Sequence, residues 1–422
     1  MTYLLCSTPV HGNVSPMVSI GAYLVSRGHR VIMLTGTRFD QRVRDAGMEF
    51  RPLAGGADFD DRDVPSYLPR HDELSGLAQA QYDIQTIFVK TIPDQYRAVI
   101  AILADEKVDA ILVDGTFAGV APLLPEANRP PIIAVGVTPL AQSSRDVAPM
   151  GMALPPSSTP IGRLRNRALG SLARHVLFRD TQATGERMFA EVGAPPLELF
   201  VMDLSSAFDR FLQLSTASFE YPRSDLAANT SFVGPLPTVP GGAPLPEWWD
   251  DLDGSRPVVH VSQGTIDNRD LDRLIRPTLA ALAESDVLVV VSLGGRDGAD
   301  LGELPANARV ASYLPYDQLL PRTDVFITNG GYGGVQHALG HGVPLIVAGG
   351  TEDKPEVAAR VAWSGVGIDL RTGTPTSRVI RSAVERVLGT NSFTDNATAM
   401  AEEIALHTPF DTIERELLTL SR

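Results

Sequence analysis

The sequence predicts an α/β protein with two doubly wound domains. Strand-like and helix-like segments alternate at its beginning, and the same alternation restarts at residues 257–261 and 287–291. A stretch rich in proline and glycine, residues 233–245, separates the two halves. The chain has 422 residues, 44% of them hydrophobic, which is more than one core usually accommodates.

The first half opens with a βαβ pattern. Residues 3–7 read as a buried parallel strand and 31–34 as the next strand. Between them, we expect a turn at residues 11–14, followed by a helix with Ser15 as its N-cap and Pro16 in its first turn. Further strands are predicted at 110–113 and 131–135. Ligands of such sheets bind beyond the carboxyl ends of the strands.

These patterns set the predicted boundaries. The N-terminal domain covers residues 1–232, the linker 233–245 and the second domain 246–400, and C-terminal helices follow at 401–422. Residues 55–75 and 140–200 lack periodicity, and we interpret them as variable loops and helices over one face. Long irregular segments are often binding loops. Within them, the series Arg163, Arg165 and Arg167 is interpreted as surface.

Composition narrows the class of protein. The net charge of −14 argues against nucleic acid or an anionic membrane as partner. No basic leader and no apolar run long enough to span a bilayer is evident. The single cysteine, Cys6, excludes an internal disulfide. A cytoplasmic protein without an integral membrane segment is the expectation.

A glycine-rich run is the most informative motif. Residues 328–335 read Thr-Asn-Gly-Gly-Tyr-Gly-Gly-Val, after a strand-like segment and before a helix-like one. Backbone amides of such a turn approach anions closely, and the helix N-terminus favours negative charge. The run therefore predicts a phosphate or pyrophosphate site at residues 329–335.

Other loops of the second half are candidates for the same ligand. Residues 262–265 and 292–295 each follow a strand, although ordinary strand termination explains either one alone. Tyr313 offers a ring for a nucleobase and Leu314 a main-chain amide, with a core tyrosine as the alternative. The carboxylates of residues 352–353 suit the hydroxyls of a sugar, with a solvated charged turn as the alternative.

Metal binding is not predicted. His337 and His341 have a zinc-compatible spacing, but no third ligand is apparent. The acidic residues 58–61 are interpreted as an exposed loop. In the N-terminal half, His11, Asn13 and Asp114 fall on the predicted ligand edge, where a histidine oriented by an aspartate would form a base.

Together, these motifs resemble the nucleotide-sugar-dependent glycosyltransferases of family 1, which have the GT-B fold. The resemblance is closest to bacterial enzymes that decorate natural products such as antibiotics. It is carried by residues 328–339, by Gly342-Val343-Pro344 and by Asp353-Lys354-Pro355, and it is strongest at 4–36 and 310–370.

The resemblance implies two domains facing across a cleft and an inverting, metal-independent transfer of a hexose. The donor would be a UDP- or dTDP-sugar and the acceptor an apolar small molecule, with no other cofactor. The implied donor-binding residues are Gly264, Thr265, Tyr313, Leu314, Asn329, Gly330, Gly331, Gly333, Gly334, Val335, Glu352, Asp353 and Lys354. The last helix would pack back on the N-terminal domain, and a homodimer is left open.

Several positions depart from the family pattern. Asn329 stands where histidine is frequent, Gly334 where serine or threonine is common, His337 where glutamate is common, and Lys354 where glutamine is common. Loss of the side-chain donor at Gly334 leaves backbone amides there, and Lys354 points to an unusual sugar preference.

The departure at Asn13 is the most serious. The family's catalytic base is usually a histidine at this position, and the family aspartate that orients it falls on Asp114. An amide is not a base, and losing a general base lowers rates by about 10²–10⁴. Three readings remain open. In the first, His11 serves as the base instead. In the second, Asp114 acts directly or through water, or the acceptor hydroxyl is acidic enough to need little help, and in the third the chain is catalytically weakened. A weakened chain would be a nucleotide-sugar-binding auxiliary protein, and another GT-B chemistry such as epimerisation is a further alternative.

Overall fold

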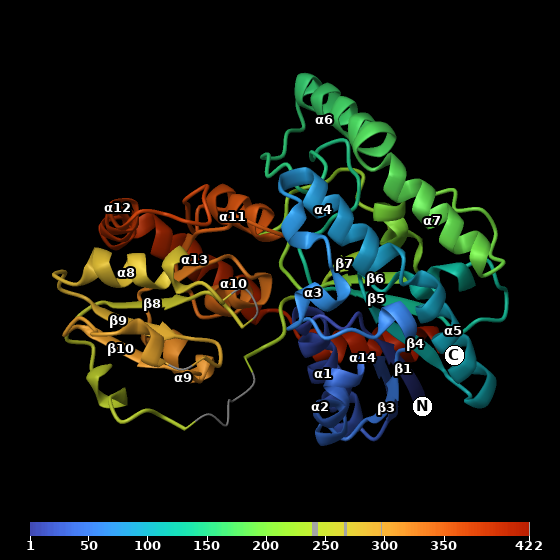
Figure 1. Ribbon diagram of the computed structural model, residues 1–422, viewed down its shortest axis with the longest axis horizontal. Coiled ribbons are helices and arrows are strands. Elements are labelled where there is room, and N and C mark those ends of the chain that lie inside the picture. Colours follow the sequence, from blue (N-terminus) through green and yellow to red (C-terminus); the bar gives the residue numbers. More distant parts are fainter. Residues whose placement is uncertain (239–243, 266–267, 297, 422) are drawn as a thin grey trace.

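The computed structural model describes residues 1–238, 244–265, 268–296 and 298–421, and in these the chain forms two α/β domains. The first contains a seven-stranded sheet in the order β3-β2-β1-β4-β5-β6-β7, and the second a six-stranded sheet in the order β10-β9-β8-β11-β12-β13. The recorded strand pairs of both sheets are parallel. The predicted α/β class with two doubly wound domains is confirmed (Figure 1).

The first sheet is buried on both faces. Its strands are β1 (Thr2–Cys6), β2 (Arg30–Thr35), β3 (Glu49–Pro52), β4 (Ala110–Asp114), β5 (Ile132–Gly136), β6 (Arg210–Gln213) and β7 (Thr230–Phe232). The helices of this part of the chain are α1 (His11–Ser26), α2 (Asp40–Asp45), α3 (Val64–Tyr67), α4 (Gly76–Ile84), α5 (Ile92–Asp105), α6 (Pro160–Leu172) and α7 (Arg179–Glu191). Alternate residues of β1 point into two different hydrophobic clusters, Leu4 into one and Leu5 into the other. This explains the continuous apolar run of the strand.

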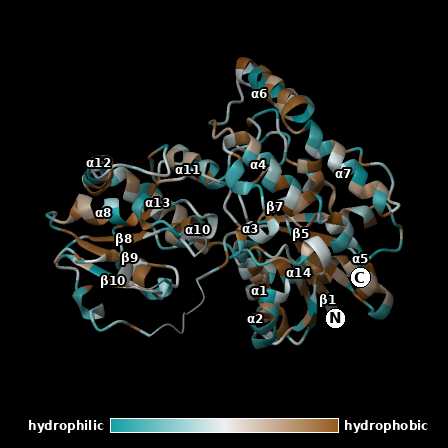
Figure 2. Cartoon of the chain, viewed as in Figure 1, coloured by the Kyte–Doolittle hydropathy of each residue, from teal (hydrophilic) through white to brown (hydrophobic). Residues whose placement is uncertain are grey.

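The second sheet has the same layered construction. Its strands are β8 (Val258–Ser262), β9 (Leu288–Ser292), β10 (Ala308–Ala311), β11 (Val325–Thr328), β12 (Leu345–Val347) and β13 (Gly367–Asp369). The helices of this half are α8 (Ile275–Leu282), α9 (Tyr316–Leu319), α10 (Tyr332–Gly340), α11 (Lys354–Trp363), α12 (Ser377–Leu388), α13 (Asn391–Ala405) and α14 (Pro409–Leu420). Figure 2 shows brown, hydrophobic strands inside each domain with more polar helices around them.

The first helix starts earlier than the sequence suggests. The predicted turn at residues 11–14 is wrong, because α1 already begins at His11, and Ser15 and Pro16 lie within it. Two contacts fix this first turn in place: the His11 amide donates to Asp61 at 2.7 Å, and Asn13 Nδ2 donates to Asp114 at 3.0 Å. Tertiary contacts thus outweigh the local N-cap signal of Ser15-Pro16.

The chain crosses between the domains twice. Part of the predicted linker, residues 239–243, lies outside the described residues. At the end of the chain, α13 contacts α10 of the second domain, whereas α14 packs against α1 of the first. Ile413 and Leu417 of α14 are fully buried in the first domain's core, and Tyr23 of α1 donates to Asp411 at 2.6 Å.

A short segment of the first domain, residues 215–221, is embedded in the second. Phe219 is fully buried in the cluster that α10, α11 and α13 form over the second sheet. Ser218 hydrogen-bonds Glu403 of α13, and Gln336 of α10 donates to Ser215 at 3.2 Å. The segment therefore belongs to the packing of both domains.

Candidate functional site

The predicted donor-binding loops all lie at one edge of the second sheet. Residues 263–265 follow β8, 293–296 follow β9, 329–331 follow β11, and 348–353 follow β12. Since the strands are parallel, their carboxyl ends share this edge. The structure thus brings the separate sequence motifs together.

Gly330 sits at the closest approach of two of these loops. Its φ of +92° is a left-handed conformation that favours glycine. A Cβ at this position would come within 2.8 Å of Val347 Cγ1 and 3.3 Å of the Lys354 carbonyl oxygen. The loop after β11 therefore packs directly on the start of α11, and only glycine fits without displacement.

The N-terminus of α10 presents backbone amides without a side-chain cap. Gly331 is the N-cap residue and offers no side-chain acceptor. The amides of the first helical turn have no acceptor inside the helix. A Cβ at Gly333 would meet no atom within 4 Å, so space remains in front of this turn. This end of α10 therefore has the exposed amides and the positive partial charge that favour an anion.

Two asparagines tie the loops to one another. Asn329 Nδ2 donates to the Gln263 carbonyl at 2.6 Å, and Asn329 Oδ1 accepts from the Gly331 amide at 3.4 Å. Asn268 Nδ2 donates to the carbonyls of Gly264 at 3.1 Å and of Leu293 at 2.9 Å. Asn329 is therefore at least partly a structural residue that orders the glycine-rich turn.

The residues after β10 have different surroundings. Tyr313 is 56% exposed and lies over the loop after β9, where a Cβ on Gly295 would be 2.4 Å from the Tyr313 hydroxyl oxygen. The side chain of Leu314 is buried in the cluster with Leu319 and Trp249. The ring of Tyr313, and not the side chain of Leu314, is available for a ligand.

Charged residues after β12 begin α11. Lys354 is 4% exposed and forms an ion pair with the exposed Glu352. Burial raises the pKa of Asp353 to about 6, although the Lys354 ammonium opposes this shift. Glu352 has a φ of +57°, an uncommon backbone conformation for a side chain of this type.

In the first domain, Asp114 is fully buried and surrounded by donors. It accepts from the Thr8 amide at 2.7 Å, the Thr116 amide at 2.8 Å and the Thr116 hydroxyl at 2.5 Å. Asn13 Nδ2 completes the set at 3.0 Å and also donates to Thr116 Oγ1 at 2.8 Å. The oxygens of Asp114 are thus occupied by donors inside the protein, and Asn13 and Thr116 are the side chains that it orients.

His11 lies on the same helical turn but in another environment. Burial, followed by the charges of Arg42 and Arg38, lowers the pKa of His11 to about 4. Its main-chain amide binds Asp61, which pairs with Arg38. His11 is therefore a neutral and weakly basic imidazole at pH 7.

Comparisons with known proteins decide the family. A profile described as "Glycosyltransferase family 28 N-terminal domain" matches residues 11–134, and one described as "Erythromycin biosynthesis protein CIII-like, C-terminal domain" matches residues 276–418. The chain is 40% identical to 4'-demethylrebeccamycin synthase of Lentzea aerocolonigenes over 95% of both chains. It is a family 1 glycosyltransferase.

Another relative agrees with this assignment, and solved structures share the fold. The glycosyltransferase is 39% identical to UDP-glycosyltransferase 2 of Phaeomoniella chlamydospora, over 95% of its own chain and 91% of the relative. Its fold matches the calicheamicin glycosyltransferase CalG4 with a TM-score of 0.75 at 21% identity, over 99% and 98% of the two chains. It matches the glycosyltransferase VinC, solved in complex with dTDP, with a TM-score of 0.70 at 21% identity over 100% and 99%. The two-domain GT-B fold and sugar transfer from a nucleotide sugar follow.

The structure also brings to the candidate site residues that the sequence did not single out. Arg269 of the second domain hydrogen-bonds the carbonyl of Arg62 in the first. The pKa of Tyr67 is raised to about 12, first by burial and next by the charge of Glu352. These interactions place residues 62–67, which include α3, near the loops after β8 and β12. Thr116 could have been found from the sequence, because a threonine two residues after a strand-end aspartate often donates a hydrogen bond to that carboxylate.

His337 lies in α10, and His341 is the C-cap residue of that helix. Burial, with the nearby His341, lowers the pKa of His337 to about 4. His341 Nε2 pairs with Thr238 Oγ1 at 3.0 Å. Within the described residues, no group of three metal-ligating side chains is present and no helix is both long and apolar enough to cross a bilayer.

Proposed function

We propose that this glycosyltransferase transfers a hexose, with inversion and without a metal ion, from a UDP- or dTDP-sugar to a hydroxyl of an apolar small molecule. The observation that supports this most is the uncapped N-terminus of α10, with Gly331, Gly333 and Gly334 around it. Such a helix end stabilises the negative charge that develops on a departing diphosphate, as a metal ion does in other enzymes.

The donor would lie along the loops of the second domain. The diphosphate contacts the amides of Tyr332, Gly333 and Gly334, with Gly264 and Thr265 beside it. The nucleobase stacks on the exposed ring of Tyr313. Asp353 and Lys354 bind the sugar hydroxyls, the ionised carboxylate by accepting hydrogen bonds and the ammonium by donating them.

The reaction would be a single displacement. The acceptor oxygen attacks the anomeric carbon on the face opposite the leaving group, and the bond from that carbon to the diphosphate oxygen breaks. Its electron pair stays with the nucleotide diphosphate. The proton of the acceptor hydroxyl passes to water, because Asn13 is no base and His11 is only weakly basic. Asn13, held by Asp114 and Thr116, orients the hydroxyl.

Such a site favours acceptors whose hydroxyl is already acidic. A phenolic or enolic hydroxyl loses its proton to water more readily than an alcohol, so positioning and leaving-group stabilisation suffice. The name of one relative, 4'-demethylrebeccamycin synthase, supports a natural product as the class of acceptor.

A panel of ligands tests the donor assignment. Thermal melting with UDP, dTDP, GDP and their hexose conjugates should show an upward shift for UDP or dTDP compounds, since stabilisation follows ligand concentration over affinity. With the donor so found and a set of phenols, a transfer assay with and without EDTA should give equal rates and a product of inverted anomeric configuration. No shift with any compound, or loss of transfer with EDTA, would contradict the proposal.

A second candidate is a catalytically weakened auxiliary protein that binds a nucleotide sugar. The amide of Asn13, hydrogen-bonded to Asp114 where a base is expected, favours it. The two candidates differ in one result: an auxiliary protein binds the donor but transfers no sugar to any phenol of the panel.

A further inference from the structure

Helix α6 presents hydrophobic side chains to solvent. Ile161 is 83% exposed, Leu164 68%, Leu172 43% and Val176 63%. Ile161, Leu164 and Leu172 lie in α6, and Val176 lies in the π-helical segment 173–177 that directly continues it. With Ala168, these residues are spaced by three or four and form one stripe along the continuous helix. Figure 1 shows α6 standing out from the first domain with α7. Figure 2 shows brown turns among teal ones along it. An exposed apolar stripe on a projecting helix marks an interaction surface.

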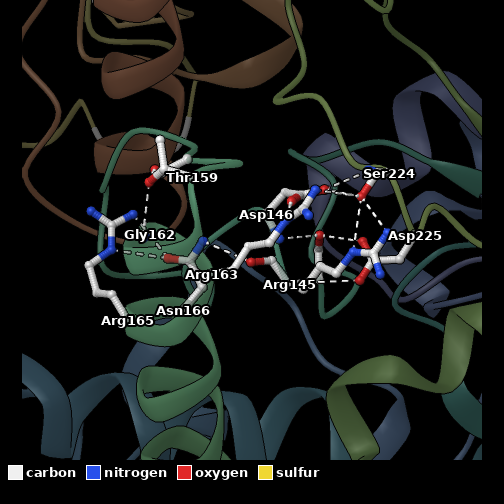
Figure 3. A network of polar contacts seen from close by, with 11 residues as sticks. Arg145, Asp146, Thr159, Gly162, Arg163, Arg165, Asn166, Ser224 and Asp225 are labelled. Carbon is white, nitrogen blue, oxygen red and sulfur yellow. Dashed lines mark hydrogen bonds and ion pairs between the residues drawn. The ribbon is translucent and has the colours of Figure 1, made fainter.

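Contacts on the opposite face of α6 fix the orientation of this stripe. The face of α6 that packs on the domain is polar: Arg163 Nε donates to Asp146 at 2.7 Å, and Asn166 Nδ2 donates to the Arg145 carbonyl at 3.1 Å (Figure 3). The Thr159 hydroxyl caps the helix by accepting from the Gly162 amide at 3.1 Å.

Asp146 anchors this network. Burial alone would raise its pKa, but the hydrogen bonds from Ser224, followed by Arg163, lower it to about 2. The anchor therefore stays ionised near neutral pH and holds the apolar stripe outward.

The charge of this segment differs from that of the whole chain. Residues 160–179 contain five arginines and no acidic residue, whereas the net charge of the chain is −14. Arg163 pairs with Asp146 and Arg174 with Asp203. Arg167 and Arg179 are exposed. A basic helix with an apolar stripe is the composition of helices that lie in the headgroup region of anionic bilayers.

The charge of this segment also indicates which partner covers the stripe. A symmetric pair of α6 helices from two copies would place arginines against arginines, with no acidic residue in the segment to separate them. The acidic remainder of the protein repels an anionic surface only over about 8 Å at physiological ionic strength, which a projecting helix can exceed. We propose that α6 and the residues 173–179 that follow it form a peripheral membrane-docking element, with its aliphatic stripe among acyl chains and Arg167 and Arg179 on anionic headgroups.

Docking would place the site next to the bilayer. The segment that leads into α6 contacts the second domain, because the amides of Gly151 and Ala153 donate to Glu356 of α11 at 2.8 and 2.7 Å. An apolar acceptor dissolved in the membrane would thus arrive near the junction of the two domains.

Vesicle sedimentation tests the proposal with the full-length protein. Wild type should sediment with phosphatidylcholine vesicles containing 30% phosphatidylglycerol, bind pure phosphatidylcholine at least about tenfold more weakly, and dissociate at high salt. The double variant Ile161→Ser/Leu164→Ser and the double variant Arg167→Gln/Arg179→Gln should each bind at least about tenfold more weakly. Two control variants, Leu406→Ser and Arg415→Gln, change exposed residues directly after α13 and in α14. They should bind the vesicles as tightly as wild type.

Unchanged melting temperatures will show that the variants are folded. If wild type does not bind anionic vesicles, or if the α6 variants bind as tightly as the two controls, the proposal is overturned. If wild type forms a dimer that Ile161→Ser/Leu164→Ser dissociates, and neither binds vesicles, the stripe is an interface with a second copy and the proposal is overturned. Binding to an acidic protein without binding to vesicles would also overturn the proposal.

Discussion

Arg360 Nε of α11 lies 2.9 Å from Glu220 Oε2 of the first domain, and both side chains are almost fully buried. Arg360 also binds Glu356 at 2.9 Å, and its guanidinium lies over the ring of Tyr221. Tyr332, at the start of α10, donates to Glu220 at 3.2 Å. The helix that is proposed to hold the diphosphate is thus connected to the contact between the domains.

Removing the shared cation should be strongly destabilising. Arg360→Met leaves two buried carboxylates without their partner, and breaking a buried pair typically lowers stability by about 3–5 kcal/mol. Chemical or thermal unfolding measures this loss. Arg44→Met breaks the exposed pair with Asp40 and should change stability by less than about 1 kcal/mol. A triple variant that also carries Glu220→Gln and Glu356→Gln should recover much of the loss; equal effects of Arg360→Met and Arg44→Met would refute this reading.

Restoring a histidine at position 13 should create a base. In Asn13→His, the imidazole would lie beside Asp114, which would orient it and stabilise its protonated form. We expect transfer to an alcohol acceptor to rise by about 10²-fold or more, and the gain to vanish in Asn13→His/Asp114→Asn. Initial rates with a saturating donor measure this.

The same variant separates the two functions proposed. With the present Asn13, rates over a series of phenols should rise steeply as the acceptor pKa falls, and Asn13→His should flatten this dependence. His11→Gln is the matched control on the same helical turn and should leave wild-type rates within a few-fold. If Asn13→His still binds the donor and transfers no sugar, the auxiliary role is favoured.

Sugar binding should depend on pH near 6. The raised pKa of Asp353, about 6, means that this carboxylate loses its proton only above that value. Because the ionised form accepts hydrogen bonds from sugar hydroxyls, affinity for the nucleotide sugar should fall as pH drops below about 6. Affinity for the nucleotide diphosphate alone should fall less. Calorimetry on wild type and Asp353→Asn between pH 5 and 8 measures both, and an identical pH dependence of the two proteins would contradict the assignment.

The same group affects folding with a definite sign. Its folded pKa lies above its ordinary value of 3.8, so between about pH 4 and 6 the folded protein holds a proton that the unfolded chain has lost. This contribution to stability is present below about pH 4 and disappears as pH rises through about 6. Asp353→Asn should lack it when melting temperatures are compared across that window.

Two glycines of the turn should respond differently to alanine. Gly330→Ala introduces a left-handed alanine against Val347 and the Lys354 carbonyl, so we expect a loss of stability of about 1–3 kcal/mol. Gly333→Ala meets no atom, so its melting temperature should stay close to that of wild type. Thermal unfolding of the two variants without ligand distinguishes them, and equal destabilisation would contradict the described geometry.

Much of the framework was predictable because it depends on local signals. Buried parallel strands read as apolar runs, and glycine-rich turns after them mark the ligand edge. That is why Asn13 and Asp114, far apart in sequence, could be expected at one edge, and why the loops holding Gly264 and Gly330 could be grouped. The order of the motifs along the chain also identified the family.

Other features could not be read locally. The burial of Phe219 in the second domain and the pairing of Glu220 with Arg360 depend on how the domains pack. The buried face of α6 could not be read from its sequence either, because its aliphatic side chains face solvent and its polar ones face the protein. The start of α1 at His11 depends on contacts with Asp61 and Asp114.

The anion site at the start of α10 is tested most directly by calorimetric titration of UDP and dTDP into wild type and Gly333→Ala. The account predicts that at least one diphosphate binds wild type and that the variant, with a methyl group in the open space before the first helical turn, binds it at least about tenfold more weakly. Equal affinity of the two proteins, at matched melting temperatures, would contradict it.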